Sequence, residues 1–402
     1  MALMPVSEAL ARVLAGVEPL SPETVALSEA HGRVLAADLT ALRTQPPADI
    51  SAMDGYAVRG ADVATVPAHL RVIGEVAAGR PFARDVGPGE AARIFTGGVL
   101  PAGADTVVIQ EVTERKGELV TVTSSTAPGR HVRHAGLDFT AGDPLLRGGQ
   151  RLTSRDLALA AAMNHATIPG HRRPKVALLA TGDELVAPGT PAAAGQIVYS
   201  NGFALGALIR REGGELVDLG IVGDDLASTV AAIGRAREWG ADVLVTAGGA
   251  SVGDYDLVQP ALTALGLELA FWKVALRPGK PLLHGRIGDM RVLGVPGNPV
   301  SAFVCALLFV VPLIRRLAGR TDVLPASESA VLGIDLPGND ERSDYLRATL
   351  QSRDGHLVAT PFPTQDSSML APLAKADCLL IREPFAPPAA AGSACCIVKL
   401  GL

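Results

Sequence analysis

The chain has 402 residues, of which 48% are hydrophobic and only 19% are charged, so it is not expected to be intrinsically disordered and can form several domains. A net charge of −5 argues against a nucleic-acid-binding protein, which usually carries a basic surface. The longest apolar run, Ala302 to Ile314, is too short to cross a bilayer, and the first residues lack a secretory signal pattern. We therefore expect a cytoplasmic protein that binds neither nucleic acid nor a membrane.

Residues 1–131 mix two kinds of pattern. An apolar stripe predicts a helix from Pro5 to Leu14, and Ser21 followed by Pro22 is typical of the start of another helix. From about residue 43 to residue 131 the pattern changes to short alternating runs separated by Gly and Pro. Such runs predict a small β module.

The helical pattern returns after this module. Ser154 is expected to cap an Ala-rich helix from Arg155 to Met163. We therefore predict an elongated, mostly helical N-terminal domain, formed by residues 1–42 and 132–172, into which the β module of residues 43–131 is inserted.

Strands and helices alternate along the next part of the chain. With helices between them, strands are predicted at Lys175–Ala180, Glu215–Val222, Val243–Thr246, Glu268–Val274 and Arg291–Val295. This alternation is typical of a doubly wound α/β domain, a parallel sheet covered by helices on both faces, which we assign to residues 173–322. After Arg320 the helical period disappears, and short strand patterns predict a C-terminal β-barrel-like domain over residues 323–402.

The loop from Ala247 to Asp256 carries the strongest single signal for a binding site. Glycines follow a buried strand here, and backbone N–H groups with no Cβ beside them can approach an anion closely. Asp254 and Asp256 end the loop and suit a hard cation such as Mg²⁺ beside a phosphate. Taken alone, the same residues fit a Gly-rich turn with solvated carboxylates equally well.

Other polar loops follow neighbouring strands of the predicted sheet. The carboxyl ends of parallel strands meet at one edge of a sheet, where ligands bind. The loops at this edge include Thr181–Glu184, Gly223–Asp225, Leu276–Pro281 and Pro296–Ser301. Acids from three strand ends fit a divalent cation that bridges phosphates, with Arg277 and Lys280 neutralising an oxyanion. Singly, each residue has a simpler interpretation: Asp224 or Asp225 as a helix cap, Arg277 and Lys280 as surface charges, and Ser301 as an N-cap.

Short motifs distributed along the chain occur in a distinctive order. They are Ser51–Ala57, Thr96–Gly98, Pro101–Asp105, Thr181–Leu185, Ser200–Gly202, Gly248–Asp256, Arg277–Pro281 and Pro296–Ser301. In this order they resemble the MoeA family, the molybdenum-inserting enzymes of molybdenum cofactor synthesis, which is related to domains of a plant enzyme and of animal gephyrin. The resemblance covers essentially the whole chain. It implies four domains, with a central MogA-like domain, in an elongated homodimer.

The resemblance also implies an activity. Adenylylated molybdopterin and molybdate would be the substrates, the anhydride would be cleaved with Mg²⁺, AMP would leave, and molybdenum would be placed on the dithiolene sulfurs. Catalytic roles would fall on Asp54, Thr96, Glu184, Asp224 and Asp256, of which the last three would hold the metal. The family positions also include Asp138, Lys273, Arg277, Pro296 and Pro299, and the strand-end loops add Gly248, Gly249, Ser251, Gly253, Lys280 and Ser301 as substrate-binding residues.

Asp54 and Thr96 lie in the β module, far in sequence from the α/β domain. In the family this module reaches across the dimer, so the site would be composite. The chain contains one MogA-like domain, so a separate adenylyltransferase would supply the substrate. Two alternatives remain: an adenylyltransferase that acts on molybdopterin itself, and a gephyrin-like scaffold that clusters partner proteins.

Overall fold

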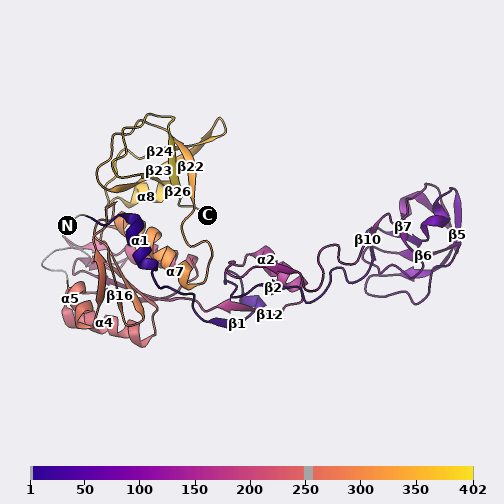
Figure 1. Cartoon of the computed structure of the whole chain (residues 1–402), viewed down its shortest axis with the longest axis horizontal. Coiled ribbons are helices and arrows are strands. Elements are labelled where there is room, and N and C mark those ends of the chain that lie inside the picture. The colour runs from indigo at the N-terminus through magenta and orange to yellow at the C-terminus, as the bar shows by residue number, and fades with distance from the viewer. Residues whose placement is uncertain (1–2, 249–256, 402) are drawn as a thin grey trace.

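The computed structural model describes residues 3–248 and 257–401 and shows an elongated molecule (Figure 1). The α/β domain and the C-terminal domain lie together at one end. The β module lies at the other end, and the N-terminal region connects the two. Residues of one chain that belong to different ends therefore cannot meet in a single site.

The α/β domain is built on one six-stranded sheet. Its strands are ordered β16 (Glu215–Val222), β13 (Lys175–Thr181), β17 (Val243–Ala247), β21 (Met290–Val295), β20 (Leu283–Ile287) and β18 (Glu268–Trp272). The first four run parallel, but β20 is antiparallel to both of its neighbours. The sheet is therefore mixed, which the sequence did not predict. β20 and β21 form a hairpin through a two-residue turn at Gly288 and Asp289.

Helices cover both faces of this sheet. One core contains side chains of α4 (Leu226–Glu238) and α5 (Val258–Ala264). The other contains side chains of α3 (Asn201–Arg211), α6 (Pro299–Cys305) and α7 (Val311–Leu317). A sheet with two separate cores on its two faces is the doubly wound arrangement that the alternating pattern predicts.

The N-terminal helix α1 (Val6–Leu14) belongs to the second of these cores. Its Ala9 and Val13 are fully buried, and Figure 1 shows the helix beside α7. The apolar stripe therefore identified the packing face correctly, but this face packs on the α/β domain and not within the N-terminal region.

The helical segment after β21 continues from Pro299 to Leu317 despite Pro312. A proline within a helix removes one hydrogen-bond donor and crowds the carbonyl four residues earlier. Here the turn directly before α7, from Ala306 to Val310, is π-helical, which absorbs this disruption. By length and composition the segment could cross a membrane, but 83% of its apolar window is buried inside the fold, as in a core helix.

The N-terminal region is mostly strands, so the prediction of a helical N-terminal domain is wrong. The outgoing and returning parts of the chain pair in three short antiparallel ladders: β1 (Pro22–Ala26) with β12 (Thr167–His171), β2 (Leu39–Thr40) with β11 (Pro144–Leu146), and β3 (Ile50–Ser51) with β10 (Val132–Arg133). The helix α2 (Ser154–Ala162) lies in the same region. In each ladder the paired residues lie more than about 80 positions apart in the sequence, so local sequence patterns could not reveal the pairing.

Two local predictions in this region also fail. Ser21 and Pro22 do not start a helix, because Pro22 begins β1 and pairs with His171. The cap of α2 is Thr153 and not Ser154: the Thr153 side chain accepts from the Asp156 N–H, and the Asp156 carboxylate accepts from the Thr153 N–H at 2.7 Å. This reciprocal pair is a capping box, which outweighs a lone serine one residue later.

The β module contains a six-stranded sheet of its own. Its strands are ordered β7 (Thr106–Ile109), β4 (Gly55–Val58), β6 (Glu90–Ile94), β5 (Ala68–Val76), β9 (Leu119–Val122) and β8 (Thr113–Lys116). Alternating runs separated by Gly and Pro therefore indicated the right class of structure for this module.

The sheet of the C-terminal domain closes into a barrel. The strands follow the order β23 (Ser343–Arg353), β24 (His356–Pro361), β22 (Ser327–Leu332), β26 (Ala394–Lys399) and β25 (Cys378–Arg382), and β25 pairs back with β23. Closure leaves these strands without a free sheet edge. The short strand β19 (Leu276–Arg277) pairs with β23 and joins the α/β domain to the barrel.

A cluster of charged side chains lies where the helices α3 and α7 end. Glu212 is 3% exposed and accepts hydrogen bonds from Arg315 at 2.7 Å, Arg320 at 2.8 Å and Arg211 at 3.0 Å. Burial opposes ionisation of this carboxyl, but the hydrogen bond from Arg315 and the surrounding guanidinium charges hold the pKa of Glu212 below its ordinary value. One carboxylate is therefore shared by three guanidinium groups, of which those of Arg315 and Arg320 are largely buried.

Replacing Glu212 by Gln should lower the free energy of unfolding by about 3 kcal/mol, because the buried guanidinium groups lose their shared carboxylate. The loss should be fully present at neutral pH and shrink as the pH falls through the depressed pKa of Glu212, since the carboxylate stabilises the fold only while it is ionised. Denaturant unfolding at several pH values measures both effects. Glu238→Gln, at the exposed end of α4, is the control, and an equal loss there would contradict the role of Glu212.

Candidate active site

A pocket of about 700 Å³ opens at the carboxyl ends of β13, β17 and β21. β13 is followed by α3, which packs on one face of the sheet, whereas the neighbouring strand β17 is followed by α5 on the other face, so a crevice forms between these two strand ends. Among the residues predicted for the site, Glu184, Asp224, Gly248, Pro296 and Pro299 line this pocket. Five of the predicted residues therefore line one cavity, and their roles in binding stay a prediction.

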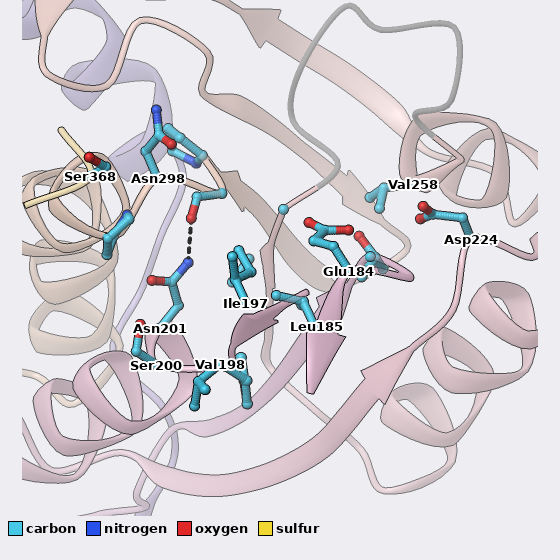
Figure 2. Close-up of a pocket in the computed structure, with 18 of the residues that line it drawn as sticks. Glu184, Leu185, Ile197, Val198, Ser200, Asn201, Asp224, Val258, Asn298 and Ser368 are labelled. Atoms are coloured by element: carbon cyan, nitrogen blue, oxygen red, sulfur yellow. Dashed lines mark hydrogen bonds between the residues drawn. The ribbon is translucent and has the colours of Figure 1, made fainter. Parts of the chain in front are cut away.

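Glu184 and Asp224 lie on the same side of the pocket (Figure 2). They follow different strands, and Asp183 joins their loops because its carboxylate accepts a hydrogen bond from the Asp224 N–H at 3.0 Å. Both residues are exposed, so both carboxylates are accessible to a ligand. The pocket therefore offers two anionic oxygen groups at one side.

Two glycines allow the strand ends to approach each other. Gly248 has a φ of +97°, and a Cβ at this position would lie 2.8 Å from the Thr181 carbonyl oxygen. Gly182 has a φ of +145°, and a Cβ there would lie 2.5 Å from a carboxylate oxygen of Glu184. At Gly248 both the backbone conformation and the neighbouring backbone oxygen require glycine, whereas at Gly182 the positive φ is the reason, because the exposed Glu184 side chain could move.

The turn from Pro296 to Pro299 forms another side of the pocket. Asn201, at the start of α3, donates its side-chain amide to the Gly297 carbonyl at 2.7 Å (Figure 2). Asn298 donates its amide to the Ser367 hydroxyl at 3.0 Å. The turn is thus held by the α/β domain at one point and by the C-terminal domain at another.

The C-terminal domain also contributes directly to the pocket wall. Ser368 and Leu370 line the pocket, immediately after Ser367. Sequence reasoning missed both residues, because nothing in their local pattern distinguishes them from an ordinary loop. It also missed the contact of Asn201, for which the Ser200–Gly202 motif was the available signal.

A small two-stranded ladder supplies an apolar part of the lining. β14 (Leu185–Val186) pairs with β15 (Ile197–Val198), and Ile197 and Val198 remain 55% and 47% exposed. Tyr199 follows this ladder, is buried, and has a hydroxyl with no hydrogen-bond partner among the residues that the structure describes. Burial raises the pKa of Tyr199, so the hydroxyl stays protonated. Gly202 makes room for it, because a Cβ there would lie 1.9 Å from the Tyr199 oxygen.

Arg277, predicted to bind an oxyanion, is not part of the pocket lining. Its guanidinium donates to both carboxylate oxygens of Asp344, at 2.6 and 2.7 Å, and to Asp340 at 2.9 Å. The hydrogen bond to Asp344, with the charges of both acids, raises the pKa of Arg277. Most of the donors of this guanidinium are therefore engaged in joining the α/β domain to the barrel, and the geometry gives the oxyanion role no support.

Three other residues that were predicted to bind substrate also do not line the pocket. Lys273 places its ammonium 5.3 Å from the centre of the Trp272 ring, and Lys280 is exposed. Ser301 is buried within α6. Their proximity in sequence to lining residues such as Pro281 and Pro299 does not bring their side chains into the described part of the pocket wall.

The first turn of α6 offers few free backbone donors to the pocket. Pro299 has no backbone N–H, and the Val300 N–H donates to the Ser367 carbonyl at 3.0 Å. In the part of the chain that the structure describes, the pocket is lined by the carboxylates of Glu184 and Asp224 and by no Lys or Arg side chain. The described wall is therefore negatively charged.

Asp54 and Thr96 lie together in the β module, at the other end of the molecule from the pocket (Figure 1). The Asp54 carboxylate accepts hydrogen bonds from the Thr96 N–H and the Thr96 hydroxyl, both at 2.8 Å. These bonds, with the backbone one largest, hold the pKa of Asp54 below its ordinary value. Asp138 is exposed and lies between the strands β10 and β11 of the N-terminal region. None of these three residues meets the pocket of its own chain.

The remaining predicted residues, Gly249, Ser251, Gly253 and Asp256, lie outside the described residues. Their assignment to a phosphate and metal loop stays a prediction.

Replacing Tyr199 by Phe should raise the free energy of unfolding by about 1 kcal/mol, because a buried hydroxyl without a partner is removed while the ring still fills its site. Denaturant unfolding of the unliganded protein measures this change. A lower stability would show that the hydroxyl is hydrogen-bonded in solution and would contradict the geometry described above.

Models of known protein families match three parts of the chain. The MoeA N-terminal region (domain I and II) matches residues 4–164, the probable molybdopterin binding domain matches residues 177–316, and the MoeA C-terminal region (domain IV) matches residues 329–400. These matches place the pocket in the domain described as a probable molybdopterin binding domain, next to domain IV.

Proteins of similar sequence align with most of the chain. The molybdopterin molybdenumtransferase of Nostoc sp. is 41% identical over 83% of this chain and 78% of its own length. That of Haemophilus influenzae is 35% identical over 91% and 90%. A crystal structure of the molybdopterin biosynthesis MoeA protein from Pyrococcus horikoshii superposes with a TM-score of 0.84 at 28% identity, covering 99% of this chain and 100% of that one. These matches and likenesses show that the chain belongs to the MoeA family.

Proposed function

We propose that the chain is a molybdopterin molybdenumtransferase, which inserts molybdenum into adenylylated molybdopterin and releases AMP in a Mg²⁺-dependent reaction. The observation that carries this proposal is the pocket at the carboxyl ends of β13, β17 and β21, in the domain whose family is described as molybdopterin-binding. Its relatives carry the same enzyme name. The pocket volume of about 700 Å³ suits a ligand as large as a pterin nucleotide.

The charge of the pocket supports a role for Mg²⁺. A phosphoanhydride and molybdate are both anions, yet Glu184 and Asp224 make the described wall negative. A hard divalent cation with carboxylate ligands resolves this repulsion. Glu184 and Asp224 would hold the ion, with Asp256 as the third candidate ligand. When bound, the ion would neutralise phosphate oxygens, while Asp183 keeps the Asp224 loop beside Glu184 through its hydrogen bond of 3.0 Å.

The position of Asp54 and Thr96 supports a homodimeric site. Their hydrogen bonds hold a partly exposed, ionised carboxylate in a fixed orientation, but the pocket of the same chain lies at the other end of the molecule. A second chain, arranged antiparallel, would bring the β module of one subunit to the pocket of the other. The site would then be completed only in the dimer.

A subunit-mixing experiment tests the shared site. Homodimers of Asp54→Asn and of Asp224→Asn should both be almost inactive, because each lacks one part of every site. Random mixing of the two should restore about a quarter of the wild-type activity, since half of the dimers are mixed and each has one intact site of two. Release of AMP from adenylylated molybdopterin in the presence of molybdate is the measurement. No recovery after verified subunit exchange would contradict a site shared between chains.

The metal role of Asp224 is tested by its Mg²⁺ dependence. Asp224→Asn removes a charge that a hard cation prefers, so the low residual AMP release of this variant should reach half of its own maximum only at roughly tenfold more Mg²⁺ than the wild type needs. Asp225→Asn is the matched control: Asp225 caps α4 by accepting from the Ser228 N–H at 2.7 Å, and Asn caps nearly as well. An unchanged Mg²⁺ requirement in Asp224→Asn would remove Asp224 from the metal site.

The same assay distinguishes the two enzyme alternatives. A molybdenumtransferase should release AMP from adenylylated molybdopterin and molybdate without ATP, and a separate adenylyltransferase would then supply its substrate. Consumption of ATP with unmodified molybdopterin would favour the adenylyltransferase instead. A protein with neither activity that nevertheless binds partner proteins would favour the scaffold.

A further inference from the structure

The wall that the C-terminal domain adds to the pocket is an irregular segment of the chain. Residues 362–369 connect β24 to α8 (Leu370–Lys375), and the residues from Ser367 to Leu370 reach the α/β domain. No helix or strand hydrogen bonds hold a segment of this kind, so other contacts must fix its shape. The question is which residue supplies them.

Arg347 supplies most of these contacts. It lies in β23, is 1% exposed, and heads the largest fully buried side chains of the described protein. Its guanidinium donates to the carbonyls of Met369 at 2.8 Å, Asp366 at 2.9 Å and Thr364 at 3.4 Å, and to the Gln365 side-chain oxygen at 3.3 Å. The segment is thus wrapped around one planar cation.

Gln365, which belongs to this segment, forms further hydrogen bonds with the Arg347 backbone. Its side-chain oxygen also accepts from the Arg347 N–H at 3.0 Å, and its amide nitrogen donates to the Arg347 carbonyl at 3.0 Å. A planar guanidinium offers donors in fixed directions, whereas an ammonium is a point charge on a flexible stem. The identity of residue 347 therefore sets the path of the backbone from Thr364 to Met369.

The outer side of the same segment contacts the pocket. The Ser367 carbonyl accepts from the Val300 N–H and its hydroxyl accepts from the Asn298 amide, both at 3.0 Å. Ser368 and Leu370 then line the cavity. Arg347 does not line it, so any effect of this residue on the site passes through the segment.

We propose that Arg347 is a positioning residue for molybdenum transfer, which fixes the segment of residues 364–370 as the C-terminal wall of the substrate pocket. This inference rests on the proposed function of that pocket. Because Arg347 fixes the position of this segment, the C-terminal domain would determine how tightly the substrate is bound. It would do so without a side chain that contacts the reacting atoms.

Arg347→Lys tests the proposal, with Arg353→Lys as the matched control. Both residues lie in β23, but Arg353 is exposed and donates to the Gln351 side chain of its own strand at 2.6 Å. Two measurements are made on the full-length protein: hydrogen exchange of the backbone amides of residues 364–370, and AMP release as a function of the concentration of adenylylated molybdopterin. A folded state is verified by circular dichroism and thermal unfolding.

In Arg347→Lys we expect faster exchange in residues 364–370 and a rise in KM of roughly tenfold, with kcat close to that of the wild type, because a displaced wall weakens substrate binding. Arg353→Lys should match the wild type in both measurements. Should Arg347→Lys fail to fold, Gln365→Ala keeps the guanidinium, opens the same wrapping and should give the same pattern.

Unchanged exchange in residues 364–370, or faster exchange with an unchanged KM, would overturn the proposal. So would a fall in kcat alone. If the wild-type protein releases no AMP from the same substrates, the proposed function is contradicted, and the exchange measurement still tests separately whether Arg347 orders the segment.

Discussion

The close approach of β13 and β17 at their carboxyl ends is the constraint on which the candidate active site depends. Gly248 follows β17 at a positive φ, and a Cβ at this position would lie only 2.8 Å from the Thr181 carbonyl oxygen. After β13 the chain continues to α3 on one face of the sheet, and the helix that follows β17 in sequence, α5, lies on the other face, so a crevice is left between the two strand ends. A residue with a Cβ at position 248 would force these strand ends apart and disturb the crevice.

Two further parts of the fold complete the pocket around this contact. Asn201 holds the turn at Gly297 from the α/β domain, and Ser367 meets Asn298 from the barrel. Arg277 adds an ionic connection between the same two domains through Asp344 and Asp340. The pocket is therefore an interdomain site, even though its two described carboxylates come from one sheet.

The sequence predicted the features that depend on local pattern. Glycine and acidic residues after apolar strands indicated Gly248, Glu184 and Asp224, because the ends of parallel strands share one edge whatever the rest of the fold does. It could not predict the partners of Arg277, since an arginine beside a Gly-Pro loop looks the same whether it faces an anion or acids more than sixty positions later. The antiparallel β20 and the wall at Ser368 were missed for a similar reason: both depend on contacts that no local pattern reports.

The N-terminal region shows the same limit and has a mechanical consequence. The β module is attached by two chain segments that pair with each other, at β1 with β12, β2 with β11 and β3 with β10. A domain on a single tether can swivel freely about its backbone bonds, whereas a double tether whose strands are hydrogen-bonded resists torsion and bends mainly in one direction. The orientation of the β module is thus restricted within the single chain, which would lower the rotational entropy lost in the proposed dimer.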